Sequence, residues 1–173
     1  LEHVHHRFRD RVKTEMITIK TKGDRTLFFD FLPLDVGKVK GYSFKFQLYT
    51  VPGQVMYNET RKLVLRGVDG VVFVADSLAM RQEKNISSLK NLQENLATYK
   101  KDIFKVPLVM QYNKRDLDNQ GIPLLPVQVM EKNLNSKLKA PVFCTSAVNG
   151  SNVIPTLKKI ITMTVESLSK ELL

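Results

Sequence analysis

The sequence predicts an α/β domain built on a mostly parallel β-sheet with one antiparallel edge strand. Short apolar runs rich in β-branched and aromatic residues, at 71–75, 106–112 and 142–145, are typical of strands buried on both faces. Apolar residues also recur every three or four positions at 86–99 and 153–168, which predicts amphipathic helices. Strands that alternate with helices favour parallel pairing, so these segments are expected to form the parallel part of the sheet.

The antiparallel edge is predicted from two earlier segments. Residues 27–32 form an apolar, aromatic run bounded by Pro33, and residues 42–49 alternate between apolar and polar side chains. The intervening LDVGKVKG stretch carries Gly37 and Gly41 as turn signals, which indicates a hairpin with a loose loop.

Two short helices complete the pattern. One is expected to be capped by Asn58 and to run through Leu65, and the other to be opened by Pro126 and to run through Leu134. No repeat, low-complexity segment or Gly/Ser-rich linker divides the sequence, so we expect a single domain over residues 1–173.

Composition narrows the class of protein. Hydrophobic residues make up 43% and charged residues 25%, a mixture typical of a folded globular chain. A single cysteine, Cys144, allows no internal disulfide, which favours the cytoplasm; it lies in an apolar strand and is interpreted as a core residue. The net charge of 27 − 17 = +10 contains no long run of like charges, so we interpret it as a solvated basic surface. A nucleic-acid-binding module ranks last because aromatic and basic residues do not interleave, and membrane contact is expected to be peripheral at most.

In open α/β sheets, ligands bind at the carboxyl ends of the strands, and polar motifs lie there. Asn113, Lys114 and Asp116 follow the second buried strand as N-K-x-D. A carboxylate at Asp116 suits the N1–H and N2–H₂ donors of guanine, which adenine lacks. Lys114 is able to lay its aliphatic stem on the base face, and Asn113 to tie neighbouring loops together. An ordinary polar turn is the alternative interpretation.

Two further strand ends carry related signals. Ser146 and Ala147 follow the last strand and resemble the second base-binding loop of guanine-nucleotide proteins, in which a backbone N–H meets guanine O6, although a Ser-Ala pair is common by chance. Gly53 and Gln54 follow the strand that ends near Tyr49. Glycine lets the backbone approach a phosphate, and the glutamine is suited to orient an attacking water. Pro52-Gly53 as a simple turn is the alternative.

The three motifs occur in the order found in Ras-like small GTPases, which the chain resembles. It resembles the bacterial MglA (mutual gliding) family of polarity-switch GTPases most closely. The strings that carry this resemblance are DRTLFFDFLPLDVG at 24–37, LYTVPGQVMYN at 48–58, RKLVLRGVDGVVFVADS at 61–77 and QYNKRDL at 111–117. The resemblance implies a P-loop NTPase fold with a doubly wound sheet, and a switch that hydrolyses GTP to GDP with Mg²⁺.

The resemblance also assigns roles to individual residues. It implies that Gln54 is the catalytic glutamine, that Gly53 senses the γ-phosphate and that Thr26 binds Mg²⁺ in the GTP state. Arg25 matches an arginine finger supplied in cis, although from the sequence alone it reads as an exposed loop charge.

Thr50 stands where most Ras relatives have an aspartate that orients a Mg²⁺-bound water. Asp30 is our candidate to replace that carboxylate, against the alternative of a solvent-facing residue on an edge strand.

The resemblance implies partners as well. In the MglA family a homodimeric Roadblock-type protein, MglB, regulates the switch regions, and the GTP state sits at one cell pole and recruits polarity or motility effectors.

One expected motif is missing from the sequence. None of the eight glycines fits the phosphate-binding G-x-x-x-x-G-K-[S/T] pattern. We therefore expect these 173 residues to be a trimmed part of a longer protein, in which residues 1–8 are the middle of the helix after the P-loop. The alternative is a degenerate, non-catalytic scaffold that binds partner proteins. His3, His5 and His6 lack a completing ligand shell and are interpreted as surface residues of that helix.

Overall fold

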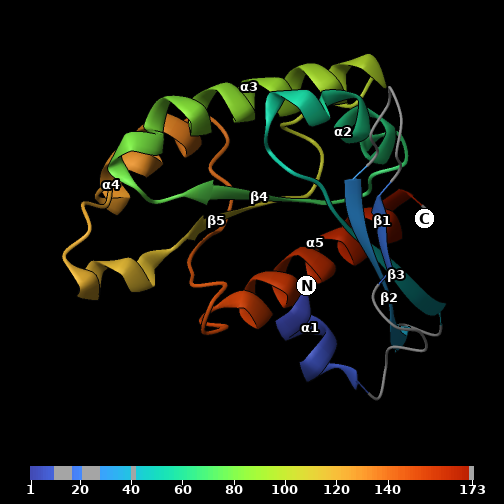
Figure 1. Ribbon diagram of the computed structural model, residues 1–173. Coiled ribbons are helices and arrows are strands. Elements are labelled where there is room, and N and C mark those ends of the chain that lie inside the picture. Colours follow the sequence, from blue (N-terminus) through green and yellow to red (C-terminus); the bar gives the residue numbers. More distant parts are fainter. Residues whose placement is uncertain (10–16, 21–27, 40–41, 172–173) are drawn as a thin grey trace. The chain divides into compact units, whose positions relative to one another are not determined.

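The computed structural model describes residues 1–9, 17–20, 28–39 and 42–171, which divide into two compact units, Leu1–Arg66 and Gly67–Leu173 (Figure 1). Both kinds of sheet predicted from the sequence are present, an antiparallel one in the first unit and a parallel one in the second. None of the helices among the described residues has both the length and the apolar character needed to cross a bilayer.

The first unit is built on the antiparallel sheet, whose strand order is β1-β2-β3. Its elements are α1 (Glu2–Arg7), β1 (Ile17–Lys20), β2 (Phe28–Val39), β3 (Tyr42–Thr50), a 3₁₀ turn (η2, Val55–Tyr57) and α2 (Asn58–Leu65). Strand β1 was not expected from the sequence. Its four residues are too few to show a clear alternation, but they pair with the start of β2 from Ile17 to Lys20.

The β2–β3 hairpin is longer and tighter than expected. Pro33 does not end the strand but pairs with Gln47, and the pairing of β1 with β2 that the described residues show runs as far as Phe31. A proline has no backbone N–H to donate, so it is tolerated in a strand where that position faces no hydrogen-bonded neighbour.

The expected loose loop is also largely strand, because β2 continues to Val39, which pairs with Tyr42. Gly37 instead makes a bulge, with a φ of +80° and its N–H donating to the Asp35 carboxylate at 2.9 Å. Gly41 lies outside the described residues. On β3 the predicted alternation is confirmed, since Lys45, Gln47 and Tyr49 are exposed while the residues between them are not.

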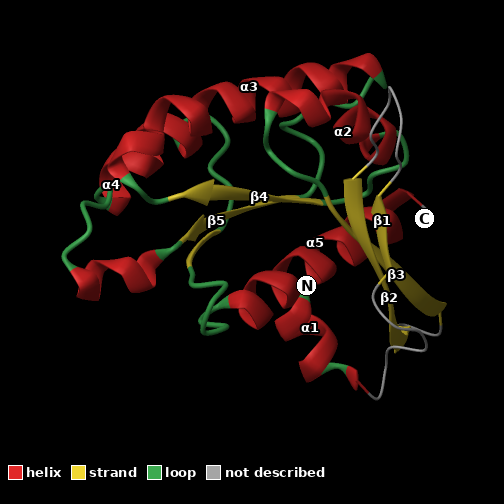
Figure 2. Cartoon of the chain, viewed as in Figure 1, coloured by secondary structure: helices red, strands yellow, loops and turns green. Residues whose placement is uncertain are grey.

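The second unit contains the parallel sheet, with strand order β4-β5-β6. Its strands are β4 (Val71–Asp76), β5 (Leu108–Asn113) and β6 (Val142–Cys144), and its α-helices are α3 (Gln82–Thr98), α4 (Val127–Met130) and α5 (Val153–Glu171). The 3₁₀ turns η3 (Ala79–Arg81) and η4 (Arg115–Gln120) and a π-helical turn, η5 (Glu131–Asn135), complete it. Figure 2 shows α3 and α5 on opposite faces of this sheet, and both are helices as the periodicity of their sequences predicts.

Burial in the parallel sheet follows strand position. The central strand β5 is buried from Leu108 to Tyr112, as predicted. Val74 of β4 is 53% exposed and β6 is only half-buried, so the expectation of burial on both faces is wrong for these flanking strands. Cys144 is likewise half-buried rather than a core residue.

A close approach of helix α5 to strand β4 explains one glycine. A Cβ on Gly70 would collide with Thr164 and stand 3.2 Å from Ile160. Glycine is therefore the residue that lets this helix lie against the start of β4.

The capping residues of the two short helices, α2 and α4, differ from the expectation by one position. Tyr57, not Asn58, occupies the N-cap position of α2, and Pro126 is the N-cap residue of α4 rather than its first helical residue. The segment through Leu134 is helical, but it changes to π-helical geometry at Glu131.

Candidate functional site

The predicted base-recognition residues come together at the carboxyl ends of β5 and β6. The Asn113 side-chain oxygen accepts the Ala147 N–H at 2.9 Å and the Thr145 hydroxyl at 3.3 Å. The backbone N–H of Arg115 donates to the Thr145 carbonyl at 3.0 Å. Asn113 therefore ties the two loops together, as its place in the motif suggested.

Asp116 lies in η4 with one carboxylate oxygen, Oδ1, buried and without a hydrogen-bond partner among the described residues. Burying an oxygen of a carboxylate without a donor is costly, so such groups in native proteins nearly always have a partner. The unpaired oxygen fits a ligand that brings N–H donors, which is the chemistry expected of a guanine edge.

Ser146 and Ala147 are engaged within the unit. Ser146 is buried, its hydroxyl accepts the Asn149 N–H at 3.3 Å, and its own N–H donates to the Ser151 carbonyl at 3.2 Å. The Ala147 N–H already donates to Asn113, so a guanine O6 that met this amide would share it with the asparagine oxygen. Shared, three-centre hydrogen bonds of this kind are common.

Lys114 has a partner that the motif search did not find. Its ammonium donates to Asp76 Oδ2 at 2.8 Å, and its backbone is left-handed with a φ of +70°. Asp76 ends β4 directly opposite Asn113 in the parallel register. A carboxylate that follows a buried strand run was visible in the sequence, but only the strand register brings it to the lysine.

In the first unit, Asp30 and Thr50 face each other across the β2–β3 pair, and the Thr50 hydroxyl donates to Asp30 Oδ2 at 2.9 Å. Asp30 is half-buried and pairs with Thr18 of β1 on its other side, so the alternative of a solvent-facing residue on an edge strand is wrong. The carboxylate thus lies beside the threonine that replaces the usual switch aspartate.

Gly53 and Gln54 lie in an exposed turn after β3, and a residue from α2 holds that turn. One guanidinium nitrogen of Arg61 donates to the carbonyl oxygens of Pro52, at 2.9 Å, and Gln54, at 2.7 Å. Burial lowers the pKa of Arg61 from its usual value, although an arginine remains charged. Sequence reasoning missed Arg61, because one arginine in a short helix carries no signal of its own.

The other two predicted site residues, Arg25 and Thr26, lie outside the described residues, so their assigned roles stay predictions.

Comparison with known proteins decides the family. A family model described as "Arf: ADP-ribosylation factor family" matches residues 17–164. The chain is also 46% identical over 170 residues to the mutual gliding-motility protein MglA of Myxococcus xanthus (strain DK1622), an alignment that covers 98% of this chain and 85% of that protein. This chain belongs to the Arf family of Ras-like small GTPases. The resemblance to MglA and the Ras-like α/β fold expected from the motifs are thereby confirmed.

Arf-family GTPases in general bind GTP or GDP with Mg²⁺ and hydrolyse GTP. Among the described residues no group of three or more His, Cys, Asp or Glu side chains is placed to hold a metal ion, and this covers His3, His5 and His6. Mg²⁺ is commonly held by one or two protein oxygens together with water and substrate phosphates. The paired oxygens of Asp30 and Thr50 are a donor set of this type.

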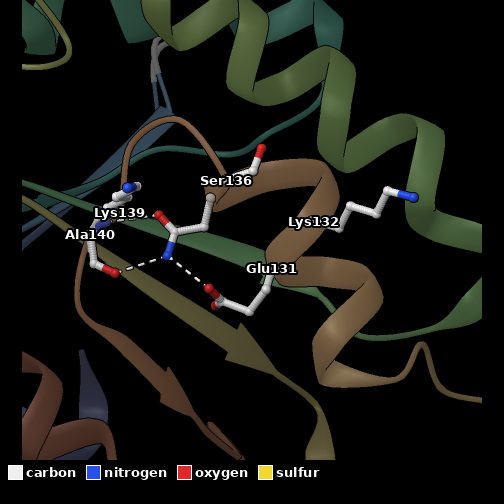
Figure 3. Close-up of a pocket in the computed structure, with 6 residues that line it drawn as sticks. Glu131, Lys132, Ser136, Lys139 and Ala140 are labelled. Atoms are coloured by element: carbon white, nitrogen blue, oxygen red, sulfur yellow. Dashed lines mark hydrogen bonds between the residues drawn. The ribbon is translucent and has the colours of Figure 1, made fainter.

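A surface hollow of about 390 Å³ in this Arf-family chain lies elsewhere (Figure 3). Its lining includes Glu131 and Asn135 but none of the predicted site residues. Glu131 accepts from the Tyr112 hydroxyl at 2.9 Å and from Asn135 at 3.1 Å, and Asn135 also binds both backbone groups of Ala140. These hydrogen bonds join the π-helical turn to β5 and to Ala140.

Proposed function

We propose that this protein is a GTP-binding and GTP-hydrolysing molecular switch whose N-K-R-D loop selects guanine. The observation that carries the proposal is the buried, unpaired Oδ1 of Asp116, in a loop whose neighbours are held by hydrogen bonds of Asn113. An adenine edge would leave that oxygen without a donor, which makes adenine nucleotides poor ligands. The proposal requires a phosphate-binding loop in the product of the natural gene.

Hydrolysis is assigned to the first unit. Gln54 orients the attacking water, Gly53 binds the γ-phosphate through its N–H, and Arg25 counters the charge that develops on the transferred phosphoryl group. These roles rest on the motif match. The hydrogen bonds of Arg61 to the turn that carries Gln54 support the assignment, because a catalytic side chain needs a fixed backbone.

Asp30 and Thr26 are the residues proposed to hold Mg²⁺. The ion would neutralise phosphate charge when bound. The hydrogen bond between Thr50 and Asp30 supports the placing of a carboxylate here, because it restrains the rotamer of Asp30 beside the threonine.

The wider role follows the relative, whose name places it in gliding motility. We propose that the GTP state controls cell polarity or motility from the cytoplasm, at the cell pole, through polarity or motility effectors. A Roadblock-type MglB homodimer is the expected regulator. A pull-down of this protein loaded with GTP or GDP against purified MglB tests the regulator, and equal failure of both states to bind would contradict it.

The base-recognition proposal is tested with the protein expressed from its natural gene. After denaturation, the released nucleotide is identified by chromatography, and affinities for GDP and ADP are then measured. Asp116→Asn is expected to weaken GDP binding by about 10- to 100-fold, the equivalent of one or two charge-assisted hydrogen bonds.

Asp118→Asn is the matched control, because Asp118 is an exposed acid in the same turn, η4. Unchanged GDP-over-ADP preference in Asp116→Asn would refute base recognition. No released nucleotide, together with no binding of GTP and Mg²⁺, would replace the switch by a non-catalytic scaffold.

A further inference from the structure

The strongest unassigned contact in the second unit joins two neighbouring strand ends. Lys114 of the N-K-R-D loop and Asp76 at the end of β4 are 38 residues apart in sequence and form a 2.8 Å ion pair. The Asp76 side chain is 22% exposed and that of Lys114 43% exposed, so water screens this pair only in part. Asp76 lies in one of the strings that carry the family resemblance, at 61–77, but the resemblance assigned it no role.

Asp76 is itself held rigidly. Its Oδ1 accepts the Leu78 N–H at 3.0 Å, which leaves Oδ2 for the lysine. Its backbone is bound on both sides by the buried Asn85 of α3, which accepts the Asp76 N–H at 3.0 Å and donates to its carbonyl at 2.8 Å. The carboxylate is therefore a fixed anchor and not a mobile surface charge.

A second cation lies near the same carboxylate. Arg81 Nε stands 3.8 Å from Asp76 Oδ2, farther than the Lys114 ammonium. Because both positive groups share one carboxylate, removal of its charge takes away the acidic partner that the described residues give to Lys114 and Arg81. The ion pair then no longer holds the Lys114 side chain toward the end of β4.

The consequence concerns the lysine stem. A free lysine side chain samples many rotamers, and ordering it on ligand binding costs affinity. A tether at the ammonium keeps the four methylene groups extended, and those groups are the part able to cover the face of a flat base. The left-handed backbone of Lys114, with a φ of +70°, sets the direction in which the stem leaves the loop.

We propose that Asp76 is a positioning residue for nucleotide binding, which acts by holding the Lys114 stem against the face of the bound purine. This inference rests on the proposed function and deepens it. Asp116 reads the base edge and sets which base binds. The Asp76–Lys114 pair acts on the face of the base and not on its hydrogen-bonding edge. It therefore sets the dissociation rate of any purine nucleotide.

The test measures dissociation of a fluorescent GDP analogue, and of its inosine counterpart, from the protein expressed from its natural gene. Asp76→Asn keeps an acceptor for the Leu78 N–H and removes only the charge. Lys114→Gln removes the cation, and both changes are also combined. Each single variant is expected to release GDP about tenfold faster, and the double variant no faster than the quicker single one, because the two residues act as one unit.

The matched control is Asp102→Asn. Asp102 accepts an N–H two residues ahead, from Phe104, at the same 3.0 Å, but none of the contacts described for it involves a lysine side chain. It should release nucleotide at the parent rate. Circular dichroism and thermal unfolding check that all variants fold.

Each outcome of this experiment either supports or overturns the role of Asp76. Faster release with a non-additive double variant, and an unchanged ratio of guanosine to inosine affinities, supports the proposal. Parent-like release from Asp76→Asn, additive effects, or a changed ratio overturns it while leaving the guanine switch intact. A parent protein that binds no guanine nucleotide overturns the proposed function and this inference together.

Discussion

Loss of the Arg61 guanidinium is expected to slow GTP hydrolysis without weakening nucleotide binding. In the structure, one nitrogen of Arg61 donates to the Pro52 and Gln54 carbonyls at 2.9 and 2.7 Å, and so closes the turn that presents Gln54. Arg61→Ala removes both hydrogen bonds. The two carbonyls belong to a partly exposed turn, so water replaces the lost donors there.

The size of the effect follows from these contacts. Hydrogen bonds to a charged group contribute about 1.5–3 kcal/mol each when buried. Because water reaches this turn, we expect the two hydrogen bonds together to stabilise the ordered turn by about 1–2 kcal/mol, which corresponds to a factor of about 5–30 in the ratio of ordered to disordered turn. If only the ordered turn positions the attacking water, single-turnover hydrolysis slows by up to the same factor.

The assay loads the protein with GTP, starts a single turnover and follows phosphate release, with GDP dissociation measured in parallel. Lys62→Ala is the control, since Lys62 is the next cation on α2 and pairs with Glu59 at 3.1 Å instead of binding the turn. Arg61→Lys should restore part of the rate, because a single ammonium replaces the planar fork imperfectly.

Combination with Gln54→Leu sharpens the test. If Arg61 acts through Gln54, adding Arg61→Ala to Gln54→Leu costs no further activity. Hydrolysis by Arg61→Ala at the parent rate, or a loss equal to that of Lys62→Ala, would refute the role of the arginine.

Two further predictions concern Asp30 and Tyr112. Asp30→Asn keeps an acceptor for Thr50 and so should fold normally, but the Mg²⁺ concentration that gives half-maximal hydrolysis should rise several-fold; an unchanged Mg²⁺ titration would remove Asp30 from the metal site. Burial and the bond to Glu131 raise the pKa of Tyr112 above its usual range, so the folded state holds this proton more tightly than the unfolded state. Stability from this source is complete below about pH 10 and declines as the pH rises further. Tyr112→Phe should lower the free energy of unfolding by about 1–2 kcal/mol near neutral pH. It should also flatten the alkaline decline measured by urea unfolding, and an equally steep decline in the variant would contradict this assignment.

Local patterns carried much of the fold. The alternation along β3 and the periodicities of α3 and α5 predicted those elements because each signal lies within one segment of chain. Features that depend on contacts with other segments of the chain could not be predicted in this way. Val74 looks like a core residue in its apolar run, yet its exposure depends on what covers its side of β4. Pro33 looks like a strand end, yet β2 continues past it and pairs there with Gln47 of β3.

The residues of the candidate site also fall into those that the sequence predicts and those that only the structure identifies. Asp116 and Asn113 were predicted because their motif is contiguous in sequence. Asp76 and Arg61 were not, because their importance appears only when strand register or a helical turn brings them to a motif residue. A carboxylate at a strand end and an arginine in a short helix are each too common to be recognised alone.

The hydrogen bonds of the base site indicate how affinity and selectivity separate. Asn113, Lys114 and Ala147 all have partners within the second unit, so much of the entropic cost of ordering these loops is met on folding and not on binding. Asp116 Oδ1 is the predicted base-site oxygen that is buried without a partner in the part of the chain the structure describes. A change at Asn113 or Lys114 that loosens these loops should therefore weaken the binding of every purine nucleotide alike. In the proposed function Asp116 accepts the guanine N–H donors, so a change at this residue should alter the ratio between bases.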